Sequence, residues 1–384
     1  MHRRNFIRLA GGGLVVGATA GLTGCSSALP PEAVAAWRGP ADNTADIRRW
    51  LLSYAILAPH SHNLQSWLVD LRQPDEMMLY CDLSRLLPET DPMSRQMMIS
   101  QGTFIELLDL AARRRGLRAD IELFPQGEFD PVKLDRRPTA RIRLTPDAQV
   151  LADPLFDQIL LRRTNREAYE ARPPAGPAVE ALKSSMASHA VRAGFIDSTQ
   201  GPAIQQHRDL ANEAFRIELV TPHTLMESIK VLRVGPREIA QHRDGLSVNT
   251  PMVRLLSAVG LFDRSKPPAP THAAVTSRIS DFMEKMEATP AFFWMVTQGN
   301  SRKTQINTGR AYVRAQLAAT QHGVSMQPLS QALQEYPEQR ETYARIHRLV
   351  DAPAPSNTVQ MWMRLGYAPP VGPSPRRGVE AHIV

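Results

Sequence analysis

The sequence predicts an α+β protein of two or three units. Its 384 residues exceed the usual length of one domain, and 43% apolar with 22% charged residues is the composition of a folded chain. Short strand patterns rich in aromatic and β-branched residues stand beside long helical patterns in both halves of the sequence. Together these observations favour mixed helices and strands over an all-helical or disordered chain.

In the first half, a helix is expected to begin near residue 46, with Thr44 or Asp46 as its cap. It should end before Pro59, because a residue that precedes proline avoids helical geometry. A second, longer helix is expected from Asp91-Pro92 to Gly116, since proline fits a first helical turn and glycine fits a helix end. The strands expected around these helices are 67–71, 77–81, 119–124 and 140–144.

The second half has the same mixture of patterns. The expected helices are 154–161, 178–188, 202–220 and 302–322, and the expected strands are 191–196, 291–296 and 359–365. Residues 235–272 contain many Pro, Gly and Arg residues and little periodicity. Such a segment is either a functional lid or a surface loop, and the sequence leaves both readings open.

The N-terminus has the pattern of an export signal. Arg3 and Arg4 precede Phe6, as in a twin-arginine leader, and residues 9–22 form an apolar stretch too short to span a bilayer. The stretch ends in Leu-Thr-Gly-Cys25, which resembles a lipobox, although an uncleaved or non-lipidated leader is the alternative. Residues 1–25 therefore predict a periplasmic or extracytoplasmic lipoprotein anchored at Cys25, and residues 26–45 a Ser/Ala/Pro/Gly-rich linker.

The formal net charge of +7 is small once the arginines of the leader are set aside. No basic stripe interleaved with aromatic residues is visible, so the charge does not predict nucleic-acid binding. Cys81 is the only cysteine after the lipobox, which excludes an intramolecular disulfide in the mature chain. It lies in an expected strand, where it should be a small buried hydrophobic residue.

A compact basic motif follows the expected helix 154–161. Arg162, Arg163, Thr164 and Arg166 lie within five positions, and the planar guanidinium group matches the oxygens of a phosphate. Such a cluster either binds an anion or is a solvated basic face at a helix end. A second stretch about a hundred residues upstream, residues 58–67, favours the first interpretation.

Residues 58–67 read A-P-H-S-H-N-L-Q-S-W. With the R-R-T-N-R run at 162–166, this loop resembles the flavin-binding nitroreductase family, whose subunits open with an R-R-S-x-R phosphate clamp followed by an A-P-S-x-x-N-x-Q-P-W loop. Ser66 and Thr164 stand where the family has Pro and Ser, and here the loop precedes the clamp. In the family's homodimer, one subunit supplies the clamp and the other the loop of each FMN site. The reversed order therefore implies a fused tandem that keeps one composite site.

Three later stretches support this resemblance: a helix with the pattern G-x-A-x-x-x-x-L-A-A-T-x-x-G at 309–323, the run 326–330, and a closing L-G-Y strand with a basic tail. The chain is most similar to the Acg-like branch, whose members have two lobes in one chain. The resemblance implies an α+β nitroreductase-like fold, a monomeric internal pseudo-dimer holding FMN. The implied parts are a first lobe at 46–150, a second lobe at 151–370 with a lid insertion at 235–272, and a basic tail at 371–384.

The resemblance also implies the residues that bind FMN. Arg162, Thr164 and Arg166 would bind the phosphate, with Arg163 either joining them or facing a carboxylate. The further residues implied are Arg376 or Arg377 at the phosphate, Ser61, Asn63 and Gln65 at the ring edge, and Gln327, Pro328 and Leu329 along one ring face or as a backbone donor. No catalytic side chain is expected, since the flavin itself performs the chemistry.

Other kinds of site receive little support. His60 and His62 could chelate a metal, but no third ligand lies near them in the sequence, so no metal is predicted. No nucleophile elbow indicates a hydrolase, and no G-x-G-x-x-G follows a strand.

The resemblance implies an oxidoreductase that transfers hydride from flavin N5 to nitroaromatic or quinone-like electrophiles. Its electron donor would be NAD(P)H or an unknown exported donor, because free NAD(P)H is scarce outside the cytoplasm. For the same reason, a flavin-binding or sequestering protein with an occluded site is the alternative. A structural lipoprotein that binds no flavin is the third hypothesis.

Overall fold

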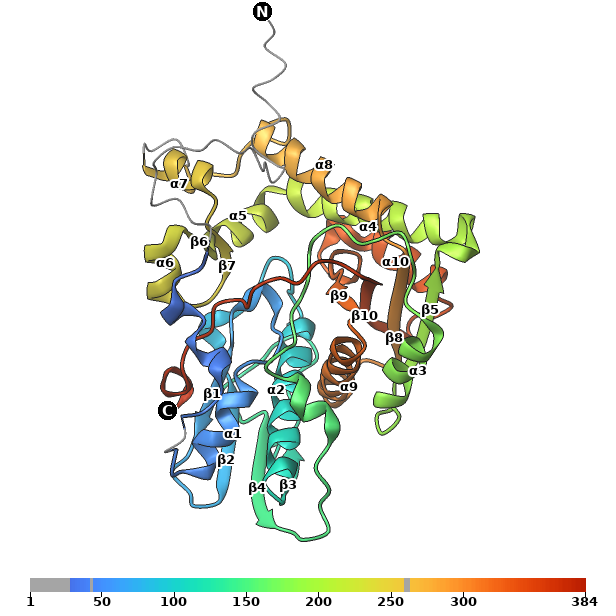
Figure 1. The fold of residues 1–384 in the computed structure, drawn as a ribbon. Helices are drawn as coiled ribbons and strands as arrows, with labels where there is room; N and C mark the ends of the chain where they lie inside the picture. Colours follow the sequence, from blue (N-terminus) through green and yellow to red (C-terminus); the bar gives the residue numbers. More distant parts are fainter. Residues whose placement is uncertain (1–27, 42–43, 259–262) are drawn as a thin grey trace, which may run out of the picture.

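A computed structural model describes residues 28–41, 44–258 and 263–384 (Figure 1). The predicted export signal at 1–25, including Cys25, lies outside these residues. The described chain forms two lobes, each built on a four-stranded antiparallel sheet and a 20-residue helix. The prediction of an α+β protein with two lobes is therefore confirmed.

The first lobe begins with a capped helix, since the Asp46 carboxylate accepts a hydrogen bond from the Arg48 amide at 2.9 Å. Its sheet has the strand order β1-β2-β4-β3. Its elements are α1 (Ile47–Ala55), β1 (Trp67–Asp70), β2 (Glu76–Cys81), α2 (Arg95–Arg114), β3 (Leu117–Leu123) and β4 (Ala140–Pro146).

The second lobe repeats this connectivity. A helix, two strands, a long helix and two strands follow one another, and the last strand inserts between the second and third, giving the order β5-β8-β10-β9. Its elements are α3 (Gly176–Ser185), β5 (Arg192–Asp197), β8 (Ala291–Gln298), α9 (Arg302–Gln321), β9 (Ser325–Pro328), α10 (Arg340–Leu349) and β10 (Asn357–Gly366). The two lobes are thus topological copies.

The long helices α2 and α9 pack against each other at the centre of the molecule (Figure 1). They approach so closely at Gly102 and Gly309 that a Cβ atom on either would lie about 2 Å or less from a carbonyl oxygen of the opposing helix. Each helix also begins with a buried arginine that donates to a carbonyl of the other lobe: Arg95 to Gln360 at 2.9 Å, and Arg302 to Met93 at 2.7 Å. The spacing from arginine to glycine is identical in the two helices.

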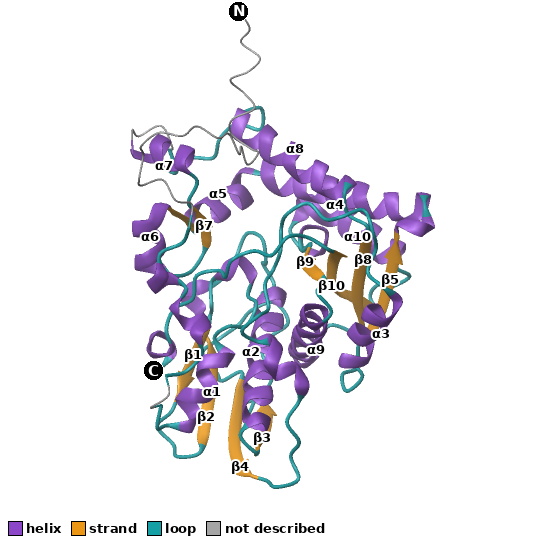
Figure 2. Cartoon of the chain, in the orientation of Figure 1, coloured by secondary structure: helices purple, strands orange, loops and turns teal. Residues whose placement is uncertain are grey.

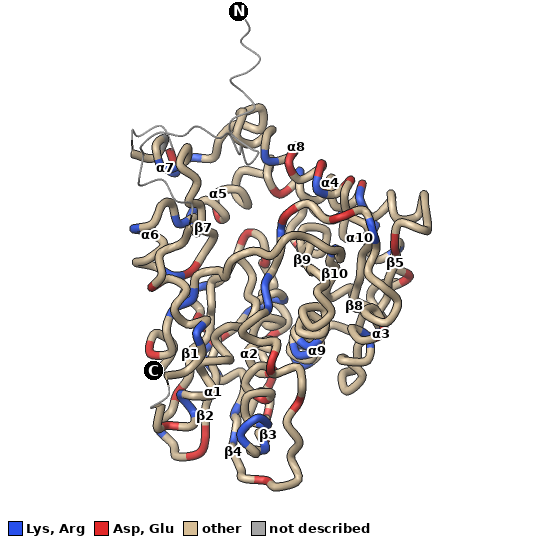
Figure 3. Tube along the Cα trace, in the orientation of Figure 1, with Lys and Arg blue, Asp and Glu red and all other residues tan. Residues whose placement is uncertain are grey.

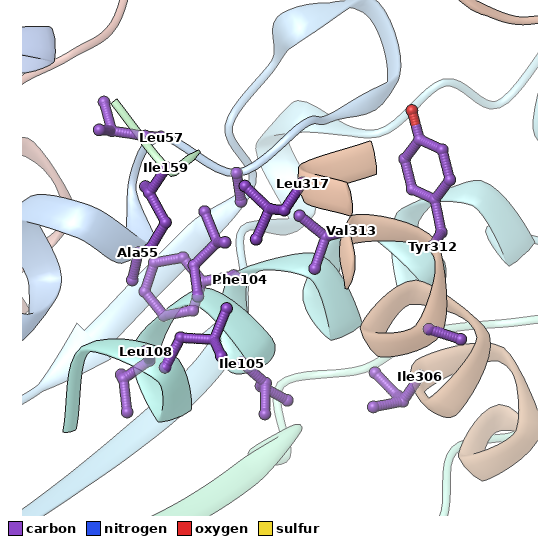
Figure 4. Close-up of a cluster of buried hydrophobic side chains, with 14 of the residues drawn as sticks. Ala55, Leu57, Phe104, Ile105, Leu108, Ile159, Ile306, Tyr312, Val313 and Leu317 are labelled. Carbon is purple, nitrogen blue, oxygen red and sulfur yellow. The ribbon is translucent and has the colours of Figure 1, made fainter. Parts of the chain in front are cut away.

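Apolar side chains fill the space beside this crossing. Figure 4 shows part of the cluster, which joins Phe104 and Ile105 of α2 to Val313 and Leu317 of α9. The second-lobe sheet has apolar cores on both faces. Successive residues of a strand point to opposite faces, and Phe292 belongs to one buried cluster whereas Phe293 belongs to the other. In contrast, β3 alternates between half-buried and exposed residues, so the first-lobe sheet is solvated on one face at this strand. The strands of the two lobes form separate groups in Figure 2.

A long insertion separates β5 from β8, whereas only residues 71–75 join β1 to β2. The insertion covers residues 198–290 and includes the parallel pair β6-β7. In Figure 1 its α5, α6 and α7 extend from the second lobe over the first. Its elements are α4 (Pro202–Val220), α5 (Pro222–Lys230), β6 (Leu232–Val234), α6 (Gly235–His242), β7 (Leu246–Val248), α7 (Pro251–Ala258) and α8 (Ala273–Glu287).

Both ends of the described chain dock on the lobes. The segment expected to be a linker forms two short turns, Pro31–Ala33 and Ala35–Arg38, and buries Trp37. The C-terminal tail leaves β10, crosses to the first lobe, and pairs Ile383 with Val69 of the edge strand β1. Among the described residues, no helix is both long and apolar enough to cross a membrane.

Candidate functional site

The basic motif at 162–166 lies in an irregular segment rather than on a helix. The expected helix 154–161 is only a short turn, Pro154–Gln158. After it, Asn165 fixes the chain by donating its side-chain amide to the Pro369 carbonyl at 2.8 Å. The direction of each arginine side chain is therefore set by the irregular backbone rather than by the regular spacing of a helix.

Arg162 is buried and points toward the end of α1. Its guanidinium donates to the Leu57 carbonyl at 2.9 Å and to Oε1 of Gln316 at 3.2 Å, but its Nε has no partner. Gln316 in turn donates to the hydroxyl of Thr164 at 3.3 Å. Burial lowers the pKa of Arg162 to about 10, so the group remains charged at neutral pH.

Arg376 brings a second buried guanidinium to the same place from the tail. It donates to the Ala58 carbonyl at 3.1 Å and to the side-chain oxygen of Asn63, while its Nε is also buried without a partner. Burial, reinforced by the charges of Arg162 and Arg163, holds the pKa of Arg376 well below its ordinary value. The cluster therefore binds carbonyls at the negative end of α1, and no carboxylate of the described chain contributes to it.

Arg166 lies close enough to the loop of the first lobe for its charge to act on His62. Its side chain is exposed to solvent, yet the surrounding protein lowers its pKa. Burial, together with the charge of Arg166, lowers the pKa of His62 to about 4, so His62 is neutral at pH 7. The structure thus brings the clamp of one lobe near the loop of the other.

Two buried polar groups border the same region. The Tyr312 hydroxyl has no partner, and Figure 4 shows its ring pointing away from the apolar cluster. Burial raises the pKa of Tyr312, against the opposing effect of the Arg162 and Arg166 charges. Arg364 of β10 is fully buried, and its guanidinium carbon lies 3.9 Å from the centroid of the Tyr169 ring. Its Nη1 atom has no hydrogen-bond partner.

The loop at 59–66 has an unusual backbone. His62, Asn63 and Gln65 have φ of 47°, 55° and 56°, values that residues other than glycine rarely adopt. Strain of this kind persists where surrounding contacts enforce it, and it concentrates at functional sites. Ser61 faces the long helix α2, donating its hydroxyl to Oε1 of Gln96 at 3.1 Å.

His60 is one of those enforcing contacts. Its Nδ1 lies 2.8 Å from the Ser61 carbonyl, and its Nε2 accepts a hydrogen bond from the Ser66 amide at 3.1 Å. This pair of partners requires the neutral tautomer with hydrogen on Nδ1. Burial lowers the pKa of His60 to about 3, which agrees with that state. His60, at the position where the A-P-S-x-x-N pattern has serine, therefore closes the loop.

Asn63 and Gln65 both bind the tail. The Asn63 amide donates to the Pro375 carbonyl at 3.0 Å, and Oε1 of Gln65 accepts from the Arg377 amide at 2.9 Å. Gln65 also donates to the carbonyl of Arg243 in the insertion at 2.9 Å. These two side chains therefore hold three separate segments together.

The run at 327–329 is part of the second-lobe sheet. Residues Gln327 and Pro328 belong to β9, and Oε1 of Gln327 accepts from Nε of Arg364 at 2.7 Å. The Leu329 amide donates to the Trp362 carbonyl at 2.8 Å. This run therefore borders the basic region through Arg364.

Sequence reasoning missed several residues of this region. Two of them had a visible signal: Arg364 is a lone charge in an apolar strand, and Trp37 is an aromatic residue in a segment of small residues and proline. Tyr312 and Gln316 had none, because both lie inside an ordinary helical pattern. Among the described residues, no group of three His, Cys, Asp or Glu side chains could hold a metal ion.

Comparison with known proteins relates the chain to nitroreductases. No family model matches it. It is 26% identical over 349 residues to "Putative NAD(P)H nitroreductase Rv3131" of Mycobacterium tuberculosis, covering 87% of this chain and 90% of that protein. It is also 29% identical over 164 residues to "Putative NAD(P)H nitroreductase acg" of the same organism, covering 42% and 47%. The sequence is similar to a named nitroreductase along most of its length.

Two solved structures are also similar. One is the FMN-dependent nitroreductase NfnB from Mycobacterium smegmatis in complex with NADPH, at 14% identity and a TM-score of 0.34, covering 55% of this chain and 86% of that chain. The other is oxidized iodotyrosine deiodinase bound to FMN and 3-iodo-L-tyrosine, at 14% identity and a TM-score of 0.33, covering 58% and 93%.

Proposed function

We propose that this protein is an exported flavoprotein oxidoreductase that binds one FMN between its lobes and reduces nitroaromatic or quinone-like acceptors. The main support is the cluster of Arg162 and Arg376, which are buried and meet no carboxylate of the described chain. A buried charge without a counter-ion is costly, and a phosphate monoester would supply the missing negative charge. The name of the 26% identical relative gives independent support.

The donors present fit a phosphate. The Nε atoms of Arg162 and Arg376 are buried without partners, and the Thr164 hydroxyl is held in place by Gln316. These groups would bind the phosphate of FMN, with Arg166 completing the clamp. When bound, FMN supplies reversible two-electron redox chemistry.

The remaining residues would orient and enclose the ligand. His62 is neutral at pH 7, so it offers hydrogen bonds rather than a charge. The Tyr312 hydroxyl remains available as a donor. The insertion contacts the loop at two points: Ser228 lies 3.1 Å from Nε2 of His62, and the Gly245 amide donates to the Asn63 carbonyl at 3.1 Å.

The proposed electron donor and the proposed cellular location are inferred from the sequence. The leader at 1–25 supports twin-arginine export in the folded state, and Cys25 supports a lipid anchor on a membrane surface. The electron donor is NAD(P)H or, outside the cytoplasm, a donor that is exported or linked to the membrane. A single chain supplies both lobes, so the proposed unit is a monomer.

The first experiment is an absorbance spectrum of the purified mature protein, with the released cofactor identified by mass. We expect about one FMN per chain. The Arg162→Ala/Arg166→Ala variant should purify without flavin. The matched Arg141→Ala/Arg143→Ala variant, altered on the outward-facing side of β4, should stay as yellow as the parent. Figure 3 shows basic and acidic residues around β3 and β4. A colourless parent that takes up no added FMN would refute the proposal.

A second candidate function is flavin sequestration, which the closed insertion favours. The Glu227 carboxylate accepts hydrogen bonds from the Thr90 amide and hydroxyl at 2.9 and 2.6 Å, and Asp244 pairs with Arg85, so the insertion is fastened to the first lobe. Reduced viologen as donor separates the two functions. Turnover of a nitroaromatic supports the enzyme, and inertness of a flavin-loaded protein supports sequestration.

A further inference from the structure

Trp37 lies outside both lobes but covers the basic cluster. The centroid of its ring is 4.4 Å from the guanidinium carbon of Arg163, 5.3 Å from that of Arg376 and 5.4 Å from that of Arg162. The tryptophan itself is only 8% exposed. One ring therefore forms a wall for three cations that come from two distant parts of the chain.

The segment that carries Trp37 is fixed to the tail by two hydrogen bonds. The Trp37 indole donates to the Ser374 carbonyl at 2.8 Å, and the Arg376 amide donates to the Ala33 carbonyl at 2.8 Å. These contacts join turns 31–38 to the residues that deliver Arg376 to the cluster. The segment and the tail therefore dock on the lobes together.

The contact with Trp37 leaves the cluster able to bind an anion. A ring face attracts a guanidinium through its quadrupole, but it does not use the N–H groups as a carboxylate would. The Nε atoms of Arg162 and Arg376 accordingly remain buried and unpartnered beside the ring. The tryptophan covers the site without neutralising it.

We propose that Trp37 is a retention residue for the phosphate monoester bound by Arg162 and Arg376, so that the phosphate end of the ligand is released only when the segment 31–38 undocks. This inference rests on the proposed FMN site and adds a residue that belongs to neither the clamp nor the loop. It also assigns the segment after the leader a part in binding.

The test compares release of FMN from the flavin-loaded parent and from Trp37→Ala. Loss of the ring uncovers the cluster and removes the cation–π contacts that hold the arginines in place, so FMN dissociation should accelerate by about tenfold. Binding of riboflavin, which lacks the phosphate, should stay within about twofold. Trp37→Phe keeps an aromatic ring over the arginines but loses the hydrogen bond to Ser374, so its FMN release should lie between that of the parent and that of Trp37→Ala.

Trp50→Ala is the matched control. Trp50 also contacts a guanidinium, that of Arg115 at 4.9 Å, but at the surface of the first lobe. The Trp50→Ala variant should therefore release FMN at the rate of the parent. Thermal unfolding of each variant without flavin would show whether Trp37→Ala is folded.

Three results would overturn the inference: unchanged FMN release from Trp37→Ala, equal weakening of FMN and riboflavin, or the same acceleration in Trp50→Ala. A parent that binds no FMN contradicts the proposed function instead. Inorganic phosphate then tests the cluster directly. It should raise the unfolding temperature of the parent above that in chloride of equal ionic strength, and less so in Trp37→Ala. A rise in unfolding temperature that is the same in the parent and in Trp37→Ala, or that is absent from both, refutes the role of Trp37.

Discussion

Replacing Gly102 by alanine tests the helix crossing that joins the two lobes. The added Cβ would lie 2.0 Å from the Ile306 carbonyl oxygen, whereas ordinary contacts of this kind begin above 3 Å. The obstacle is the backbone of a helix, so α2 and α9 must separate by about 1 Å. A gap of that size forfeits a quarter to a half of the dispersion attraction between the facing atoms.

Overpacking of this kind costs about 1–3 kcal/mol, and a rigid obstacle places Gly102→Ala at the upper end. The higher helix propensity of alanine stabilises the folded state by at most about 1 kcal/mol relative to glycine. We therefore expect a net loss of about 2 kcal/mol or more in the free energy of unfolding, measured by urea denaturation. Gly176→Ala is the control, because a Cβ there meets nothing within 4 Å.

The same reasoning predicts strong coupling with Gly309→Ala. One separation of the helices would relieve both clashes, so the double variant should be destabilised far less than the sum of the single variants. Additive losses would refute a shared displacement. A Gly102→Ala variant within about 0.5 kcal/mol of the parent would refute the clash itself, because that is the usual range of neutral surface substitutions.

Further predictions concern the insertion, a buried acid and the leader. Asp244→Asn should weaken the buried contact with Arg85 and speed hydrogen exchange in residues 231–248; unchanged exchange would contradict a fastening role. Burial raises the pKa of Glu218 to about 7, so the folded state holds a proton that the unfolded state releases above about 4.5. The free energy of unfolding should therefore fall as the pH rises from about 4.5 to about 7. The stabilisation of Glu218→Gln relative to the parent should be larger at pH 8 than at pH 5. Equal stabilisation by Glu218→Gln at pH 5 and at pH 8 would contradict a raised pKa of Glu218. Cys25→Ala should move the protein from the membrane to the soluble periplasmic fraction, and unchanged fractionation would exclude the lipid anchor.

Long periodic patterns and local motifs were the predictable part of this protein. The helix expected at 302–322 is α9 at Arg302–Gln321, because its apolar spacing persists through several turns. The irregular composition of 235–272 concealed two short helices that begin at or beside prolines, α6 and α7. The repeat of the lobes was expected only from the family resemblance, and the helices α2 and α9 share the spacing from arginine to glycine.

Side-chain direction in the candidate site was beyond the sequence. The amide of Gln65 was expected at a flavin ring, but its partner is the Arg377 amide, 312 residues away. Short polar residues with positive φ can point either way, and a distant segment decides which. Trp37 illustrates the same limit, because composition alone predicts a flexible linker where three arginines create a docking place.

The pairing of Trp37 with Ser374 also bears on how the protein is made. These residues lie 337 positions apart, and both lobes lie between them in the sequence. The wall over the arginines therefore cannot form before the strands of both lobes and the segment that carries Ser374 have been synthesised. Arg376, two residues further on, joins the cluster at the same late stage. A fusion that keeps the tail from reaching the first lobe would leave this site open even in a chain whose lobes have folded.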